Sequence, residues 1–162
     1  MTLRIPTKGN PKLDKLMEHI DADLELQQLW RSANVNAVTR FGISDHGEVH
    51  IRIVTNAALR IIRLLIEGGV VPSVVKDHEM QNEDAEVVVV LAACLHDVGI
   101  SIHRDDHERY SLIISYTKAR QLLTETGLSV AAVAQSVGYD DPLYFSRLYR
   151  RKTGRAPSEE RG

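Results

Sequence analysis

The chain has 162 residues, of which 43% are hydrophobic and 26% charged, and its formal net charge is −2. This composition is typical of an ordinary globular domain and excludes a disordered or fibrous protein. No run reaches the ~18 uninterrupted apolar residues of a membrane span, and the first residues lack the apolar core of a signal peptide. We therefore expect a cytoplasmic protein that does not bind membranes. The only cysteine, Cys94, excludes a disulfide framework and a cysteine-based zinc site, and we expect it to be a small buried hydrophobic residue.

The charges divide the chain into two parts. Residues 1–116 carry 12 Lys/Arg against 17 Asp/Glu, whereas residues 117–162 carry 8 against 5. All seven histidines also lie in the first part. We therefore expect two segments of different chemistry, 1–116 and 117–162.

The spacing of apolar residues predicts helices throughout, so the expected fold class is all-α. A first amphipathic helix is predicted over residues 11–33, beginning at Pro11. A second should begin at the capping pair Ser44-Asp45 and run to the glycines at 68 and 69, followed by a loop or short helical turn after Pro72.

The third predicted helix, capped by Asn82 and ended by Gly99, is apolar on nearly all sides and should be the central one. Its valine run alone would equally fit a buried strand, but its length and capping favour a helix. Three further helices are predicted from their caps and breakers: Asp105 or Asp106 to Gly127, a short one after Ser129, and one from Asp141-Pro142 to Gly154.

Histidines and one carboxylate recur at spacings that suit a metal site. His46 and His50 are four residues apart, as are His103 and His107, and residues at this spacing share one face of a helix. The adjacent pair His96-Asp97 ends the central helix. Any one of these histidines alone would be interpreted as a hydrogen-bonded or exposed imidazole. Together, imidazole and carboxylate suit divalent zinc, manganese, iron or nickel.

The stretches "DHGEVHIRIVTNAALRI" and "LAACLHDVGISIHRDDHERYSLI" resemble the HD superfamily of metal-dependent phosphohydrolases. This resemblance covers about residues 12–115 and implies an HD-type helical bundle that hydrolyses a phosphate-ester substrate. It implies direct metal ligation by His50, His96 and Asp97, with the His96-Asp97 pair at the catalytic centre. His107 and His103 would serve a second metal, and His46 would support the ligands. In that family the last metal ligand is an Asp well downstream of the His-Asp pair, and the resembling segment does not reach it. The resemblance therefore implies an enzyme whose activity can be impaired by the loss of this ligand.

After residue 116, "LSVAAVAQSVGY", "DPLYFSRLYRRKTG" and "APSEER" resemble the C-terminal helix-turn-helix of AraC-type transcription regulators. The resemblance implies that the helix starting at Pro142 enters a DNA major groove. It places four residues towards bases and three towards phosphates: Leu143, Tyr144, Ser146 and Arg147, then Arg150, Arg151 and Lys152. Such regulators carry two motifs and this chain carries one, so we expect weak DNA binding at most.

These two resemblances leave three hypotheses open. The chain is a metal-dependent phosphohydrolase, a DNA-binding module, or a folded inactive hybrid. The chimera-like join also has a purely structural interpretation, in which the apolar residues of 117–162 complete the truncated HD bundle. We further expect a homodimer, because a truncated bundle would leave the apolar faces of "VVVVLAACL" and "YSLII" exposed.

Overall fold

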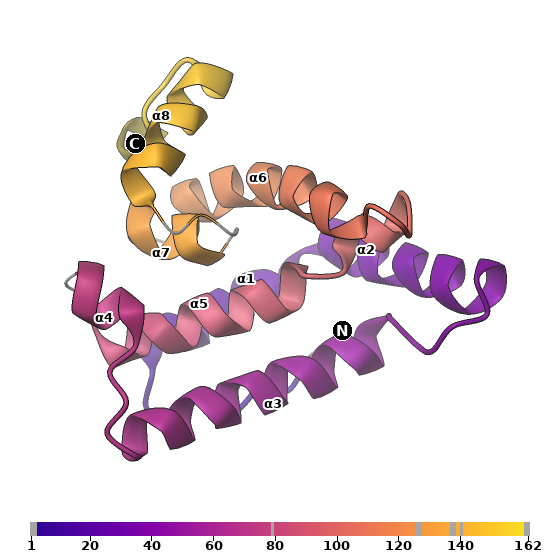
Figure 1. Ribbon diagram of the computed structural model, residues 1–162, viewed down its shortest axis with the longest axis horizontal. Helices are drawn as coiled ribbons and strands as arrows, with labels where there is room; N and C mark the ends of the chain where they lie inside the picture. The colour runs from indigo at the N-terminus through magenta and orange to yellow at the C-terminus, as the bar shows by residue number, and fades with distance from the viewer. Residues whose placement is uncertain (1–2, 79, 126–127, 137–138, 140, 161–162) are drawn as a thin grey trace.

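The computed structural model describes residues 3–78, 80–125, 128–136, 139 and 141–160, and these ranges contain helices and no strand, which confirms the all-α prediction. Figure 1 shows their arrangement. The helical elements in chain order are α1 (Pro11–Ala22), α2 (Leu24–Asn34), π-helix η1 (Val35–Arg40), α3 (Glu48–Glu67), α4 (Ser73–His78), α5 (Asn82–Leu95), 3₁₀ helix η2 (Val98–Ser101), α6 (His107–Glu125), α7 (Val130–Ser136), α8 (Pro142–Thr153) and 3₁₀ helix η3 (Pro157–Glu160).

Helix α5 is central, as predicted, and packs against α3, α1 and α7 (Figure 1). Its side chains Val87, Val90 and Cys94 are fully buried. Burial raises the pKa of the Cys94 thiol to about 12, so this cysteine is a packing residue rather than a nucleophile. The indole Nε1 of Trp30 donates a hydrogen bond of 2.9 Å to the Cys94 carbonyl oxygen, which anchors α2 to the end of α5.

The single helix predicted over residues 11–33 is wrong, because the chain breaks at Asp23 into α1 and α2. Asp23 has an extended backbone (φ −77°, ψ 91°), and its Oδ1 accepts a hydrogen bond from Leu26 N at 2.9 Å. A side chain that satisfies a free amide of the next helix stabilises a new start. Helix α5 is also shorter than predicted: it ends at Leu95, and η2 follows.

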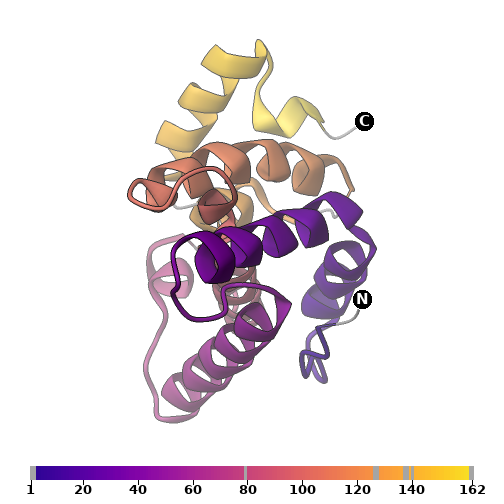
Figure 2. The same ribbon diagram turned by 90° about the vertical axis from the view of Figure 1, so that its right-hand side faces the viewer.

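The C-terminal helices complete the core that the N-terminal helices begin. Phe145 and Tyr149 of α8 and Val133 of α7 are fully buried, in one hydrophobic cluster with Val87 and Leu91 of α5. The expectation that "VVVVLAACL" is left exposed is therefore wrong, because α7 packs on α5 and covers it. Figure 2 shows α6 lying between the N-terminal helices and α8.

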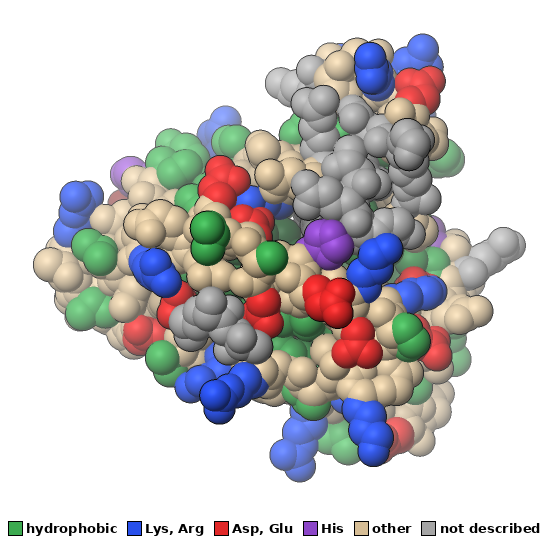
Figure 3. All heavy atoms as spheres, turned by 180° about the vertical axis from the view of Figure 1, so that it is seen from behind, with side chains coloured by type: hydrophobic (Ala, Val, Ile, Leu, Met, Phe, Trp, Pro, Cys, Tyr) green, Lys and Arg blue, Asp and Glu red, His purple; other side chains and the backbone are tan. Residues whose placement is uncertain are grey.

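Apolar surface is instead exposed on α3 and on the first half of α6. On α3, Val49, Ile53 and Leu64 are 49%, 61% and 56% exposed. On α6, the expectation for "YSLII" holds in part, since Leu112 and Ile113 are exposed. The face turned away from the viewer in Figure 1 carries acidic, basic and hydrophobic side chains intermixed (Figure 3). None of the described helices combines the length and apolar character needed to cross a membrane.

Candidate functional site

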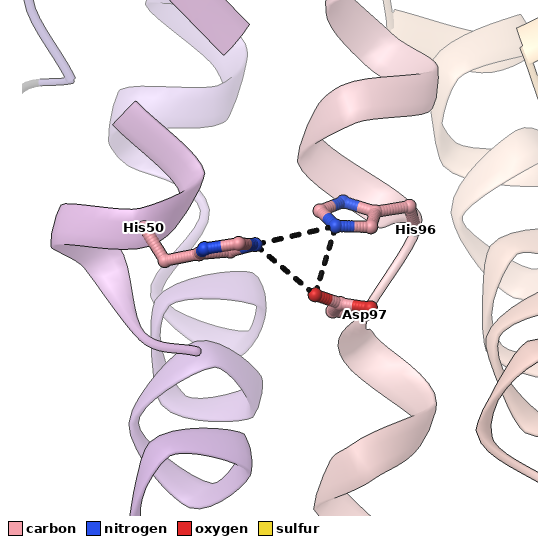
Figure 4. Close-up of side chains that lie close together, drawn as sticks. All are labelled: His50, His96 and Asp97. Carbon is pink, nitrogen blue, oxygen red and sulfur yellow. Dashed lines mark hydrogen bonds and ion pairs between the residues drawn. The ribbon is translucent and has the colours of Figure 1, made fainter. Parts of the chain in front are cut away.

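The ends of two helices bring a histidine-carboxylate cluster together. His50 lies in the first turn of α3, and His96 and Asp97 lie at the junction of α5 and η2. The start of α3 is set by Asp45, whose Oδ1 accepts hydrogen bonds from Gly47 N at 3.3 Å and from His50 N at 3.1 Å. Figure 4 shows the three side chains pointing towards one another across the gap between α3 and α5.

The distances within this cluster fit a shared cation. His50 Nε2 lies 3.4 Å from His96 Nε2 and 3.3 Å from Asp97 Oδ2, and His96 Nε2 lies 2.8 Å from the same oxygen. All three ligand atoms lie within 4.8 Å of one another. Ligands bound tetrahedrally at about 2.0–2.1 Å from one ion lie about 3.3 Å apart, so small adjustments would suffice. A neutral imidazole pair with one carboxylate fits a divalent transition metal.

The other imidazole nitrogens support this interpretation. The Nδ1 atoms of His96, His107 and His46 lie 2.8, 2.8 and 2.7 Å from the carbonyl oxygens of Ala93, Arg104 and Ser44. A carbonyl only accepts, so Nδ1 carries a proton. In the neutral ring Nε2 then keeps its lone pair, whereas a hydrogen bond from His96 Nε2 to Asp97 requires the protonated ring. Metal-binding histidines are commonly oriented in this way.

Charge in the cluster is concentrated on Asp97, which is 7% exposed. Burial raises the pKa of Asp97, but the hydrogen bond from His96 and nearby histidine charges outweigh burial and hold this pKa below its ordinary value. Burial lowers the pKa of His96, yet its hydrogen bond to Asp97 leaves the pKa raised overall. Burial also lowers the pKa of His50, and the charge of Asp97 opposes this only in part. The cluster therefore holds an ionised carboxylate against at least one neutral imidazole near neutral pH.

The three remaining candidate histidines differ in what they contact. His107 Nε2 is 3.7 Å from Asp97 Oδ1, at the edge of the cluster. The His46 ring stacks on His50 with centroids 5.0 Å apart, so it contacts one of the three candidate ligands. The ring of His103 instead faces Tyr110, with centroids 6.3 Å apart, and its described contacts do not include the cluster.

Several residues that sequence reasoning missed hold the cluster in place. Ser111 Oγ donates to the His96 carbonyl oxygen at 2.7 Å and accepts from Gly99 N at 2.9 Å, which joins α6 to the His96-Asp97 turn. Asn36 Nδ2 donates to the carbonyl oxygens of Ile100 and Ser101. A polar Ser111 within the apolar run "YSLII" was the one available signal.

The second candidate surface is the outer face of α8. Asp141 caps this helix through a 2.8 Å hydrogen bond from Leu143 N, and Gly154 ends it with φ +81°. Phe145 and Tyr149 face the core, which leaves most of the predicted DNA-contacting side chains exposed: Leu143, Tyr144, Arg147, Arg150 and Arg151.

Two of the predicted contact residues differ from that pattern. The Ser146 hydroxyl is half-buried and donates to the Pro142 carbonyl oxygen at 2.8 Å, so it can only accept from a base in this conformation. The Lys152 side chain lies outside the described residues.

Known proteins resemble both parts of the chain. Residues 109–162 match the helix-turn-helix domain family. The transcriptional regulator CdhR of Pseudomonas aeruginosa is 43% identical over 61 residues, which is 37% of this chain and 18% of that protein. The arabinose operon regulatory protein of Escherichia coli is 47% identical over 45 residues, 28% of this chain and 15% of that protein.

A third relative extends the similarity towards the N-terminus. The uncharacterized protein MJ1020 of Methanocaldococcus jannaschii is 34% identical over 116 residues, 72% of this chain and 44% of that protein. An alignment of this length must include many residues before position 109. The chain thus spans less than half the length of each of these relatives, and no solved structure matches it. The C-terminal third of the chain, residues 109–162, is therefore the part that is similar to helix-turn-helix domains, and transcriptional regulators are among the relatives of the chain.

Proposed function

We propose that the C-terminal segment, residues 117–162, binds DNA through the exposed face of α8. The observation that carries this proposal is that α8 has two different faces. Phe145 and Tyr149 are buried on one face, while Arg147, Arg150 and Arg151 reach solvent on the other. A helix anchored in this way can enter a major groove, with Leu143 and Tyr144 against base edges.

The affinity is expected to be low. Residues 117–162 carry 8 Lys/Arg against 5 Asp/Glu, a net charge of +3. One helix-turn-helix with this charge supports mainly non-specific contacts to phosphates, with a dissociation constant of roughly 10⁻⁴–10⁻⁶ M at physiological salt.

A salt series tests this proposal. Fluorescence anisotropy of a labelled duplex should give an association constant that falls steeply with salt, and Arg150→Ala should reduce the logarithmic slope by about 1. Arg60→Ala, which removes an exposed arginine from α3, is the matched control and should leave the slope unchanged. If neither Arg147→Ala nor Arg150→Ala changes the DNA affinity, α8 is not the surface that contacts DNA and the proposal is refuted.

A second candidate function, metal-dependent hydrolysis of a phosphate ester, is favoured by the convergence of His50, His96 and Asp97. These residues would hold a divalent ion, and His107 is the nearest further ligand. When bound, such an ion polarises a phosphoryl oxygen and lowers the pKa of a bound water. Three protein ligands suffice for a catalytic metal when water fills the remaining positions, so an impaired rather than absent activity is expected.

Elemental analysis of the purified protein tests the metal site, alongside a panel of phosphoesters. The double variant His96→Ala/Asp97→Ala should lose stoichiometric metal binding. His19→Ala on α1 removes a histidine outside the cluster and should leave metal binding unchanged. Unchanged metal content in the double variant would refute the site. Failure of both the metal and the DNA assays would leave the inactive hybrid as the correct hypothesis.

A further inference from the structure

Helix α6 contacts the histidine cluster at one end and the DNA-binding helix further along. In its first two turns, His107 Nε2 lies 3.7 Å from Asp97 Oδ1, and Ser111 Oγ is hydrogen-bonded to both His96 O and Gly99 N. The packing here is tight, because a Cβ atom on Gly99 would collide with the His107 carbonyl oxygen. The start of α6 cannot move without moving the turn that carries His96 and Asp97.

The same helix reaches α8 five residues beyond Ser111. The hydroxyl of Tyr116 donates to the Tyr149 carbonyl oxygen at 3.1 Å. Its ring also packs on Tyr149 and Phe145, with centroids 5.5 and 6.5 Å apart. Tyr149 and Phe145 are the buried residues that orient the exposed face of α8. Figure 1 shows α6 leading from the loop after α5 to the region of α7 and α8.

We propose that the protein is a metal-responsive DNA-binding protein, in which a divalent cation at His50, His96 and Asp97 increases the affinity of α8 for DNA through α6. The proposal rests on both functions proposed above. His107 Nε2 lies 3.7 Å from Asp97 Oδ1 but is not among the atoms that lie within 4.8 Å of one another, so joining that group requires its ring to move closer. Since Ser111 ties the same turns together, the cation fixes α6, and Tyr116 passes this constraint to α8.

The cation orders the helix that supports α8 before DNA arrives. A second binding event to an already ordered protein costs less conformational entropy, so affinity rises. Couplings of this kind between sites are typically 5–150-fold. We expect the metal-loaded protein to bind duplex DNA at least 5-fold more tightly than the metal-free protein at the same salt concentration.

The test uses the full chain, a labelled 20-base-pair duplex and Mn²⁺ as the probe, with metal content measured by elemental analysis in every sample. The wild type should gain affinity with Mn²⁺ and show slower amide exchange in α8 without DNA. Tyr116→Phe keeps the ring and the ligands but lacks the hydroxyl that reaches Tyr149, so it should bind the same metal and lose most of the gain. Tyr110→Phe is the matched control on the same helix, since its ring faces His103, and it should keep the gain.

The possible outcomes are distinct. Full metal occupancy with less than a 2-fold change in DNA affinity and no change in amide exchange would overturn the coupling while leaving both proposed functions intact. Absence of bound metal, or of DNA binding at any metal content, would overturn the coupling together with the corresponding proposed function, and the elemental analysis identifies which one. An equal gain in His96→Ala would show that Mn²⁺ acts on the DNA and would also refute the proposal.

Discussion

Replacement of Gly99 by alanine should be among the most damaging single changes in the protein. A Cβ atom at this position would collide with the His107 carbonyl oxygen and would lie 2.5 Å from Ser111 N and 2.9 Å from the His107 carbonyl carbon. All three are backbone atoms of α6, so no side-chain rotation can relieve the overlap. The first turn of α6 must shift away from η2.

The loss of folding stability caused by Gly99→Ala has two parts. Overpacking of a tight contact destabilises by about 1–3 kcal/mol. The shift also lengthens the hydrogen bond from Gly99 N to Ser111 Oγ, and a buried donor left without a partner costs about 1–3 kcal/mol. The expected loss is therefore roughly 2–6 kcal/mol, a large share of a typical stability of about 5–15 kcal/mol.

Urea unfolding with linear extrapolation measures this loss. Gly68→Ala is the comparison variant, because a Cβ atom there would lie 3.2 Å from Leu64 O and 3.4 Å from Leu65 O, which is tight but not a collision, so it should cost clearly less than Gly99→Ala. Ser111→Ala alone should cost about 1–3 kcal/mol, since it leaves Gly99 N unpaired. Because Gly99→Ala already disrupts that bond, the double variant should cost less than the sum of the single ones. A loss below 0.5 kcal/mol for Gly99→Ala would refute the packing of α6 on η2.

Three further predictions concern other parts of the fold. Lys118 is only 5% exposed in its side chain and lies 2.7 Å from both Asp23 Oδ2 and Glu25 Oε2. Lys118→Met should therefore lower the free energy of unfolding by about 2–3 kcal/mol. This loss is smaller than that for breaking a fully buried ion pair, because Glu25 is exposed. Urea unfolding that shows no loss would contradict this prediction. The hydrogen bond from Arg63 lowers the pKa of Glu86, so the stabilisation it supplies is complete above the ordinary pKa of 4.5 and is lost as pH falls through the lowered value. The stability difference between wild type and Glu86→Gln should shrink below about pH 4, and a difference independent of pH between 3 and 6 would count against it. The exposed stripe of Val49, Ile53 and Leu64 on α3 predicts self-association, which Ile53→Lys should weaken. Light scattering coupled to size exclusion should then show a wild-type mass above 18.2 kDa at micromolar concentration, and a monodisperse mass at that value would exclude the dimer.

Features that depend on a few neighbouring residues could be predicted from the sequence. Asp141, Pro142 and Gly154 bound α8 as predicted, because an N-cap side chain, a proline at the first helical position and a left-handed glycine act within one turn. The valine-rich α5 is central, because a helix that is apolar on nearly all sides must be covered on nearly all sides. The break at Asp23 was missed although its cause is also local, because the apolar spacing continues on both sides of it.

Features that depend on contacts between distant residues were decided by the tertiary structure. The sequence resemblance paired His50 with His96 and Asp97, but only the packing of α3 against α5 brings atoms 46 positions apart to 3.4 Å. The tertiary structure also distinguishes two histidines that lie in one short stretch: His107 is at the edge of the cluster, whereas His103 faces Tyr110. The coverage of α5 by α7, rather than by a second chain, depends on how two surfaces fit in three dimensions. Periodicity reports which face of a helix is apolar, whereas the partner of that face is set by shape and by the free energy of burying it, and neither is encoded in local spacing.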